Sequence, residues 1–267
     1  MPGGSRPPSA WSRPSTRVSE ATRRARGPWL HAPGGDVLRH LLAVQAQDLR
    51  TPERALAVRG GALDDGMRIT WLMRQTLHLV WADDLEWLHP LFAPRMEATN
   101  VRRLKQLGVT DPDGYVARIV ERVPATRAEL KAELGVEGQG FVHLLARAAM
   151  QGHVVQDVER RFIPWTPRDV DRDAALDELA RRYGACHHGA TRDDLAYWSG
   201  LPKRDCREPG PCLVEDGPVP RVDLPAYDEL LLGWKDRSPT VPAKLAKQVH
   251  PGGGIIRAVT LVDGVAI

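Results

Sequence analysis

The segment Pro124-Ala125-Thr126-Arg127-Ala128-Glu129-Leu130 decides the fold, because it predicts the start of a short helix that opens a recognisable module. Residues 135–140 then predict a turn, and residues 141–151 predict a second helix. Residues 153–156 and 161–165 predict the two strands of a hairpin behind these helices. This order is typical of a winged helix, which binds nucleic acid in some proteins and other proteins in others. Of these two partners we favour DNA.

Breaks in composition divide the chain around this module. Residues 1–35 are rich in Pro, Gly, Ser and Arg, with Glu20 as the one acid, so we expect a disordered basic arm there. The expected units are a first winged-helix unit at 36–121, a second at 122–170, a third, shortened one at 171–223 and the start of a truncated C-terminal β-domain at 224–267. The predicted fold class is mainly α with small β-hairpins (α+β), built from tandem winged helix-turn-helix units.

The third unit is expected to be incomplete. Residues 191–201 repeat the helix and turn that open such a unit. Residues 206–212 contain too many helix breakers to form the helix that should follow. The third unit is therefore predicted to be shortened.

Within the first unit, helices are expected on both sides of a hairpin. The predicted elements are a helix from Asp36 to the pair Gln45 and Gln47, a helix capped by Thr51, two strands over 67–80 with a turn at Arg74-Gln75, and a helix over 83–107.

Gln45 and Gln47 are the candidate catalytic residues. Side chains two apart point to different sides of an α-helix but to the same side of an extended segment, so a working pair must lie at the helix end or beyond it. A glutamine amide can orient a water molecule and stabilise charge, but it is not a strong base. Such a pair suits a substrate whose leaving group is already activated. The alternative is that both glutamines satisfy backbone groups at the end of the helix.

The segment Leu41-Leu42-Ala43-Val44-Gln45-Ala46-Gln47-Asp48 resembles the Gln-x-Gln signature of the AlkZ-type alkylpurine DNA glycosylases, which are built from tandem winged helices. Three later segments are similar to that family in the same order. They are Ile69-Thr70-Trp71-Leu72-Met73-Arg74-Gln75-Thr76-Leu77-His78-Leu79-Val80, Leu224-Pro225-Ala226-Tyr227-Asp228-Glu229-Leu230-Leu231-Leu232-Gly233-Trp234-Lys235-Asp236-Arg237-Ser238, and His250-Pro251-Gly252-Gly253-Gly254-Ile255-Ile256-Arg257. The resemblance covers most of the chain from about residue 36.

The resemblance also exposes differences from the family, one of which is the shortened third unit. Its members often carry glycine where this chain has Gln75, so we expect a strained or differently shaped turn. They continue into further strands after the position of Ile267, which is why the β-domain is expected to be truncated. The related YcaQ-type enzymes carry an aspartate at the position of Gln47.

The resemblance implies a monofunctional DNA glycosylase that hydrolyses the N-glycosidic bond of N7-alkylated purines, with interstrand crosslinks as further substrates. Such a base already carries positive charge, so the protein has to position water and stabilise positive charge on the sugar. Gln45 and Gln47 would do both. No lysine near the motif suggests a Schiff-base step. The expected partner is double-stranded DNA with alkylated purines, and no cofactor is expected.

Six further residues are candidate DNA contacts. An arginine forks onto phosphate oxygens, and a lysine offers a point charge, although each is also an ordinary surface residue. The candidates are Arg50, Arg74, His78, Lys235, Arg237 and Arg257. His78 has the alternative of being a packed residue of the hairpin.

Composition sets wide bounds on these interpretations. The chain has 267 residues, 42% of them apolar, and a formal net charge of +3, which permits nucleic-acid binding without requiring it. No run of eighteen apolar residues exists and no signal peptide is apparent, so we expect a cytoplasmic monomer without a membrane anchor. Cys186, Cys206 and Cys212 lack paired Cys-x-x-Cys spacing, and we expect no metal.

Two other interpretations remain open. The chain could be a non-catalytic winged-helix DNA-binding protein, a regulator or repair accessory, which would bind one duplex site above background and ignore lesions. It could also be a degraded fragment, which would melt without cooperativity.

Overall fold

The computed structural model describes residues 35–48, 50–212 and 221–267. The predicted basic arm lies outside the described residues except for residue 35. The helices are α2 (Val37–Leu41), α3 (Thr51–Ala57), α4 (Ala82–Gln106), α5 (Pro112–Arg122), α6 (Arg127–Leu134), α7 (Gly138–Met150), α8 (Arg172–Cys186), α9 (Arg192–Ser199), α10 (Glu229–Leu232) and α11 (Ala243–Val249). The strands are β1 (Val44–Gln45), β2 (Met67–Trp71), β3 (Leu77–Trp81), β4 (Val154–Gln156), β5 (Phe162–Pro164), β6 (Val222–Leu224), β7 (Val259–Val262) and β8 (Val265–Ala266). The predicted α+β fold class is confirmed.

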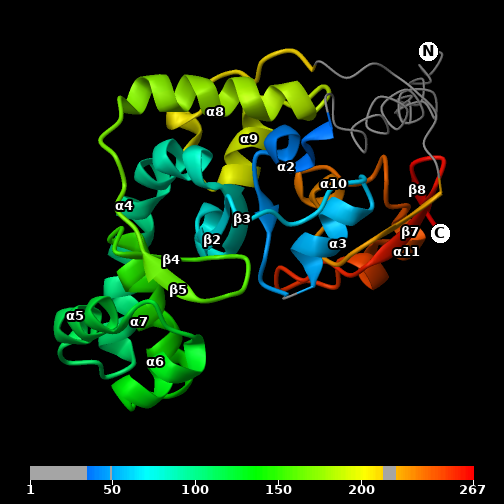
Figure 1. Ribbon diagram of the computed structural model, residues 1–267. Coiled ribbons are helices and arrows are strands. Elements are labelled where there is room, and N and C mark those ends of the chain that lie inside the picture. Colours follow the sequence, from blue (N-terminus) through cyan, green and yellow to red (C-terminus); the bar gives the residue numbers. More distant parts are fainter. Residues whose placement is uncertain (1–34, 49, 213–220) are drawn as a thin grey trace, which may run out of the picture.

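Two antiparallel sheets organise the described chain. The first has the strand order β1-β3-β2-β4-β5, and the second has the order β6-β7-β8. Helix α8 lies along one side of the first sheet, whereas α5, α6 and α7 form a lobe at its far end (Figure 1). The second sheet lies beside α3 (Figure 1). The two ends of the described chain are therefore neighbours.

Two hydrophobic cores fill this arrangement. One holds side chains of α4, α5, α7, α8 and α9, including Leu88, Leu145 and Leu179. The other joins the first described helices to the last strands, because Leu38 and Leu56 pack in the same cluster as Leu231 and Leu261. Since both the first sheet and this second core cross the expected unit boundaries, the division at residues 122, 171 and 224 stays a prediction.

The helix-turn-helix-hairpin elements expected over 122–170 are present as α6, α7, β4 and β5. Thr126 caps α6 by accepting a hydrogen bond from the Glu129 N–H, and the Glu129 carboxylate accepts one from the Thr126 N–H at 2.7 Å. Gly135 ends α6 in the left-handed region, with φ of 64°. After α9, the described residues up to 212 hold only the 3₁₀ turn Lys203–Asp205 and no further helix, as expected for the third unit.

The first helix is shorter than expected. Asp36 caps α2 as predicted, accepting the Arg39 N–H at 2.9 Å, but the helix ends at Leu41. Leu42 has φ of 67°, and the next residues form β1 instead of a last helical turn. Pairing with β3 satisfies the backbone groups that further helix would have satisfied, which places the glutamine pair beyond the helix.

Thr51 is not the cap of the next helix. It is the first residue of α3, and Arg50 is the N-cap without a side-chain hydrogen bond. The Thr51 hydroxyl instead donates to the Ala226 carbonyl at 3.1 Å. The hydroxyl that the local pattern assigned to capping therefore makes a tertiary hydrogen bond instead.

The turn between β2 and β3 is strained at two consecutive residues. Arg74 has φ of 54° and Gln75 has φ of 62°, a region that costs most side chains about 1–2 kcal/mol. We expect Gln75→Gly to raise the free energy of unfolding by about 0.5–1 kcal/mol, because glycine adopts this backbone without a Cβ clash. Urea unfolding measures the change, and Gln75→Ala, which keeps the Cβ, serves as the control. A glycine variant less stable than the alanine variant would contradict the strain argument.

Candidate active site

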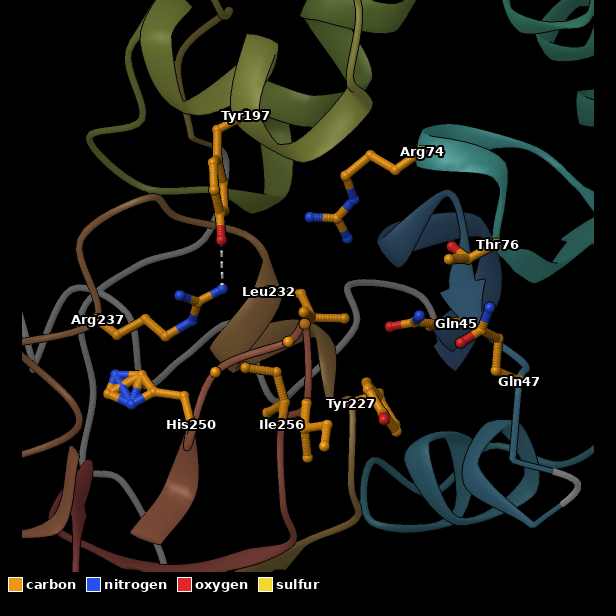
Figure 2. Close-up of a pocket in the computed structure, with 14 residues that line it drawn as sticks. Gln45, Gln47, Arg74, Thr76, Tyr197, Tyr227, Leu232, Arg237, His250 and Ile256 are labelled. Atoms are coloured by element: carbon orange, nitrogen blue, oxygen red, sulfur yellow. Dashed lines mark hydrogen bonds between the residues drawn. The ribbon is translucent and has the colours of Figure 1, made fainter. Parts of the chain in front are cut away.

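Strand β1 places both glutamines on one side of the chain. Gln45 pairs with His78 of β3, and the Ala46 N–H donates to the Leu77 carbonyl at 2.7 Å, so the segment is extended. Residues two apart in an extended segment project to the same side. Gln45 and Gln47 accordingly line the same pocket (Figure 2).

Gln45 is the more buried of the two. Its side chain belongs to a residue only 5% exposed, and its Oε1 atom accepts no hydrogen bond from any described residue. A buried acceptor left without a partner costs about 1–3 kcal/mol, so it is typically paired with a water molecule or a ligand. Gln47 is exposed. The pair thus combines a fixed inner amide with an outer one at the pocket's edge.

The opposite wall comes from the last described segments. Figure 2 shows Tyr227, Leu232 and Ile256 facing the glutamines across the pocket, with Arg74 and Tyr197 entering from above. The cavity has a volume of about 520 Å³. That is ample for one extruded nucleotide base.

The charges around the pocket are all of one sign. Arg74 and Arg237 line it, and no aspartate or glutamate is found among its described lining residues. Burial, with help from the Arg237 charge, lowers the pKa of His250, which therefore adds little positive charge at neutral pH. Its described residues offer two amides and two guanidiniums, with no carboxylate among them.

A family model described as DNA glycosylase AlkZ-like matches residues 38–216, which include both glutamines. The chain belongs to the AlkZ-like DNA glycosylase family. The solved structure of Streptomyces sahachiroi DNA glycosylase AlkZ is similar with a TM-score of 0.67 and 18% sequence identity, covering 96% of this chain and 87% of the other. At this identity, the likeness shows the shared fold. A search of curated proteins finds no match.

The AlkZ-like fold brings together only some of the expected site residues. Gln45, Gln47, Arg74 and Arg237 line the pocket. Arg50, Lys235 and Arg257 are exposed elsewhere; Arg50 precedes α3, the Lys235 N–H donates to Asp194, and Arg257 donates to the Gln248 carbonyl. These three stay predictions as outer DNA contacts.

His78 does not lie where a DNA contact is expected. The residue is 3% exposed, and its Nδ1 lies 2.9 Å from the Thr76 carbonyl oxygen. A side chain this buried cannot reach DNA from its observed position. Burial lowers the pKa of His78 to about 3, with the nearby Arg74 charge acting in the same direction. The packed alternative describes His78 correctly.

His78 should make this glycosylase less stable in acid. The unfolded chain binds a proton near the ordinary pKa of 6.5, whereas the folded chain binds it only near 3. The stability that neutral His78 contributes is therefore complete above 6.5 and is lost as the pH falls from 6.5 toward 3, by up to about 1.4 kcal/mol per pH unit. We expect urea unfolding at about pH 7, 6 and 5 to show the parent losing stability relative to His78→Gln by that slope. If the free energies of unfolding of the parent and of His78→Gln changed equally with pH, the assigned effect of His78 would be wrong.

Sequence reasoning missed the aromatic and apolar parts of the pocket. Tyr227, Leu232 and Ile256 lie in the quoted family segments, but nothing in their spacing showed that they face Gln45. The run 252–254 is a tight turn, as the glycines suggest, with the Ile255 N–H donating to the Gly252 carbonyl at 3.1 Å. The same run lines the pocket. Only the contact between distant segments reveals these roles.

No membrane-spanning or metal-binding feature is found in the described ranges. No helix in them is long and apolar enough to cross a membrane. No three His, Cys, Asp or Glu side chains in these ranges lie close enough to hold a metal ion together. Cys186 and Cys206 are buried, and Cys186 Sγ lies 3.0 Å from His187 Nδ1.

Proposed function

We propose that this AlkZ-like protein is a monofunctional DNA glycosylase that hydrolyses the N-glycosidic bond of N7-alkylated purines, including those in interstrand crosslinks. The observation that carries the proposal is the unpartnered Oε1 of Gln45 in the wall of the pocket. An acceptor held there by β1 is prepared to take a hydrogen bond from a water molecule. Gln47, on the same side of the chain, supplies a second amide.

The chemistry of the pocket fits a substrate that needs little acid assistance. A purine alkylated at N7 carries positive charge, so its bond to C1′ breaks through an oxocarbenium-like state without a strong acid. The amide oxygens of Gln45 and Gln47 would accept hydrogen bonds from the attacking water and face the positive sugar. Because the pocket's described lining lacks a carboxylate, ordinary purines with poor leaving groups should remain uncleaved.

The guanidiniums and the lack of lysine support two further parts of the proposal. Arg74 and Arg237 at the pocket suit the phosphates of duplex DNA, since guanidinium groups fork onto phosphate oxygens. No lysine is found among the described residues that line the pocket, which supports hydrolysis without a Schiff-base step. We further propose that α6, α7, β4 and β5 form one of the tandem winged-helix units and that the protein acts as a monomer.

The test uses a duplex with one N7-methylguanine and an otherwise identical undamaged duplex. The expected result is free N7-methylguanine from the first duplex only. The strand should stay intact until hot alkali cleaves the abasic site, which distinguishes a monofunctional enzyme from a lyase. No base release from a cooperatively melting protein would overturn the proposal, and selective binding of one undamaged sequence would then favour a non-catalytic regulator.

A further inference from the structure

Tyr197 of α9 points with its hydroxyl end at the Arg237 guanidinium, and the Arg74 guanidinium lies to one side of the tyrosine above the pocket (Figure 2). The Arg74 Cζ atom is 5.8 Å from the centroid of the tyrosine ring, and the Arg237 Cζ atom is 5.5 Å from it. Arg237 also donates through Nη2 to the Tyr197 hydroxyl oxygen at 2.8 Å. The ring therefore contacts both cations of the pocket.

Neither arginine is neutralised by an acid. Within residues 35–48, 50–212 and 221–267, no carboxylate forms a salt bridge with Arg74 or Arg237. Two like charges held against one ring repel each other, and the face of the ring compensates for this only in part. An anion placed between them would remove the repulsion. The arrangement calls for an anionic ligand.

Backbone packing fixes Arg74 against the end of α9. Gly200 ends this helix with φ of 75°, and a Cβ added there would lie 2.9 Å from Arg74 Cγ and 3.4 Å from Arg74 N. Glycine thus permits both the left-handed backbone and the close approach. Arg237 is held from the other side, where its Nε donates to the Leu231 carbonyl. The backbone and Cγ of Arg74 are thus held beside α9, and hydrogen bonds hold the Arg237 guanidinium.

The Tyr197 hydroxyl has a donor to spare. It accepts the hydrogen bond from Arg237, so its own O–H remains able to donate. A hydroxyl donor beside two guanidiniums is the donor set that phosphate oxygens accept.

We propose that Tyr197 is a positioning residue that holds Arg74 and Arg237 as a clamp for one backbone phosphate of the DNA strand whose base enters the pocket. The inference rests on the proposed function for the identity of the strand, but not for the binding of phosphate. The clamp acts on binding and not on the chemical step, because its charges bind the phosphate equally in substrate and transition state.

The experiment compares the parent with Tyr197→Ala and Tyr197→Phe in two measurements. Single-turnover base release from the N7-methylguanine duplex gives the half-saturating protein concentration and the maximal rate. Titration of an undamaged fluorescent duplex at several salt concentrations gives the dissociation constant and its salt dependence. For Tyr197→Ala we expect the half-saturating protein concentration to rise about tenfold while the maximal rate stays unchanged. The slope of the logarithm of the dissociation constant against the logarithm of the salt concentration should be about 1 smaller in magnitude. Tyr197→Phe, which lacks only the hydroxyl, should raise the half-saturating protein concentration by about threefold.

Tyr115 provides a matched control. Its ring is also half-buried, and the Arg118 Cζ atom lies 5.8 Å from its centroid, but Tyr115 does not line the pocket. Tyr115→Ala should leave binding and its salt slope unchanged.

Two outcomes overturn the proposal. One is a Tyr197→Ala variant whose half-saturating concentration is within twofold of the parent's and whose salt slope is unchanged, and the other is a loss confined to the maximal rate. If the alanine variant does not melt cooperatively, the test rests on Tyr197→Phe. In that case a half-saturating protein concentration equal to the parent's overturns the clamp. If the parent releases no base, the glycosylase proposal fails, while the undamaged-duplex titration still tests the clamp separately.

Discussion

Gln45→Leu is expected to lower the maximal rate of N7-methylguanine release by about 100-fold or more, a loss typical of removing one oriented polar group from a transition state. The same change should leave stability equal or raise it slightly. Gln45 Oε1 is buried without a described partner, so an apolar side chain of similar volume removes a desolvation cost. A group retained for function alone has this pairing of lost rate with undiminished stability. Single-turnover kinetics measure the maximal rate, and urea unfolding measures the stability.

The control for Gln45 is a second buried glutamine of the same sheet. Gln156 of β4 is 6% exposed but does not line the pocket, so Gln156→Leu should leave the maximal rate within a fewfold of the parent. Gln47→Ala should lower the rate as well, and the double variant should show whether the pair acts as a unit. A Gln45→Leu enzyme with the parent's rate, or one that has lost both rate and stability in proportion, would rule out the assigned role.

Asp228→Ala is expected to lower the free energy of unfolding by about 3–5 kcal/mol, because it leaves a fully buried guanidinium without its carboxylate. Arg59 and Asp228 form two hydrogen bonds, at 2.8 and 2.9 Å, and both side chains are 0% exposed. Asp228 also accepts the Leu230 N–H at 2.9 Å as the cap of α10. The pair joins the end of α3 to the segment that carries Tyr227. Urea unfolding of the parent and the variant measures the loss.

An exposed ion pair of similar length is the control. The Lys131 Nζ lies 3.0 Å from Glu137 Oε1, with side chains 49% and 81% exposed, so Lys131→Ala should cost no more than about 1 kcal/mol. The apolar double variant Arg59→Met/Asp228→Leu should recover much of what Asp228→Ala loses, since no charge is then left buried. Equal costs for Asp228→Ala and Lys131→Ala would show that burial does not govern the pair.

Local chemistry made much of the fold predictable. The helices of 122–170, the strands of 67–80 and the long helix after 83 follow patterns complete within a few residues, and the structure has all of them. The predicted end of the first helix was wrong because β1 pairs with β3, a partner more than thirty residues away in the sequence. His78 was misplaced for a similar reason. Strand β3 is buried at 78, 79 and 80 in succession, so alternation does not show which side chains reach solvent.

The candidate site was predictable only on one side. The glutamine pair carries a family signature, and both residues line the pocket. The facing wall and Tyr197 depend on the packing of α9 and of the last described segments against β1 and the β2–β3 turn. Periodicity reports which residues are buried, but it does not report which distant residue faces which. These partners follow from tertiary contacts alone.

The pocket's two walls are made at different times during protein synthesis. Ribosomes release the glutamine pair well before Tyr227, Leu232 and Ile256, which follow it by about 180 residues or more in the sequence. A nascent chain therefore carries the Gln-x-Gln motif before the facing wall of the pocket has been made. A fragment that keeps the motif but lacks the segment from residue 224 onward would still contain the whole region that the family model matches, yet it would lack this wall of the pocket.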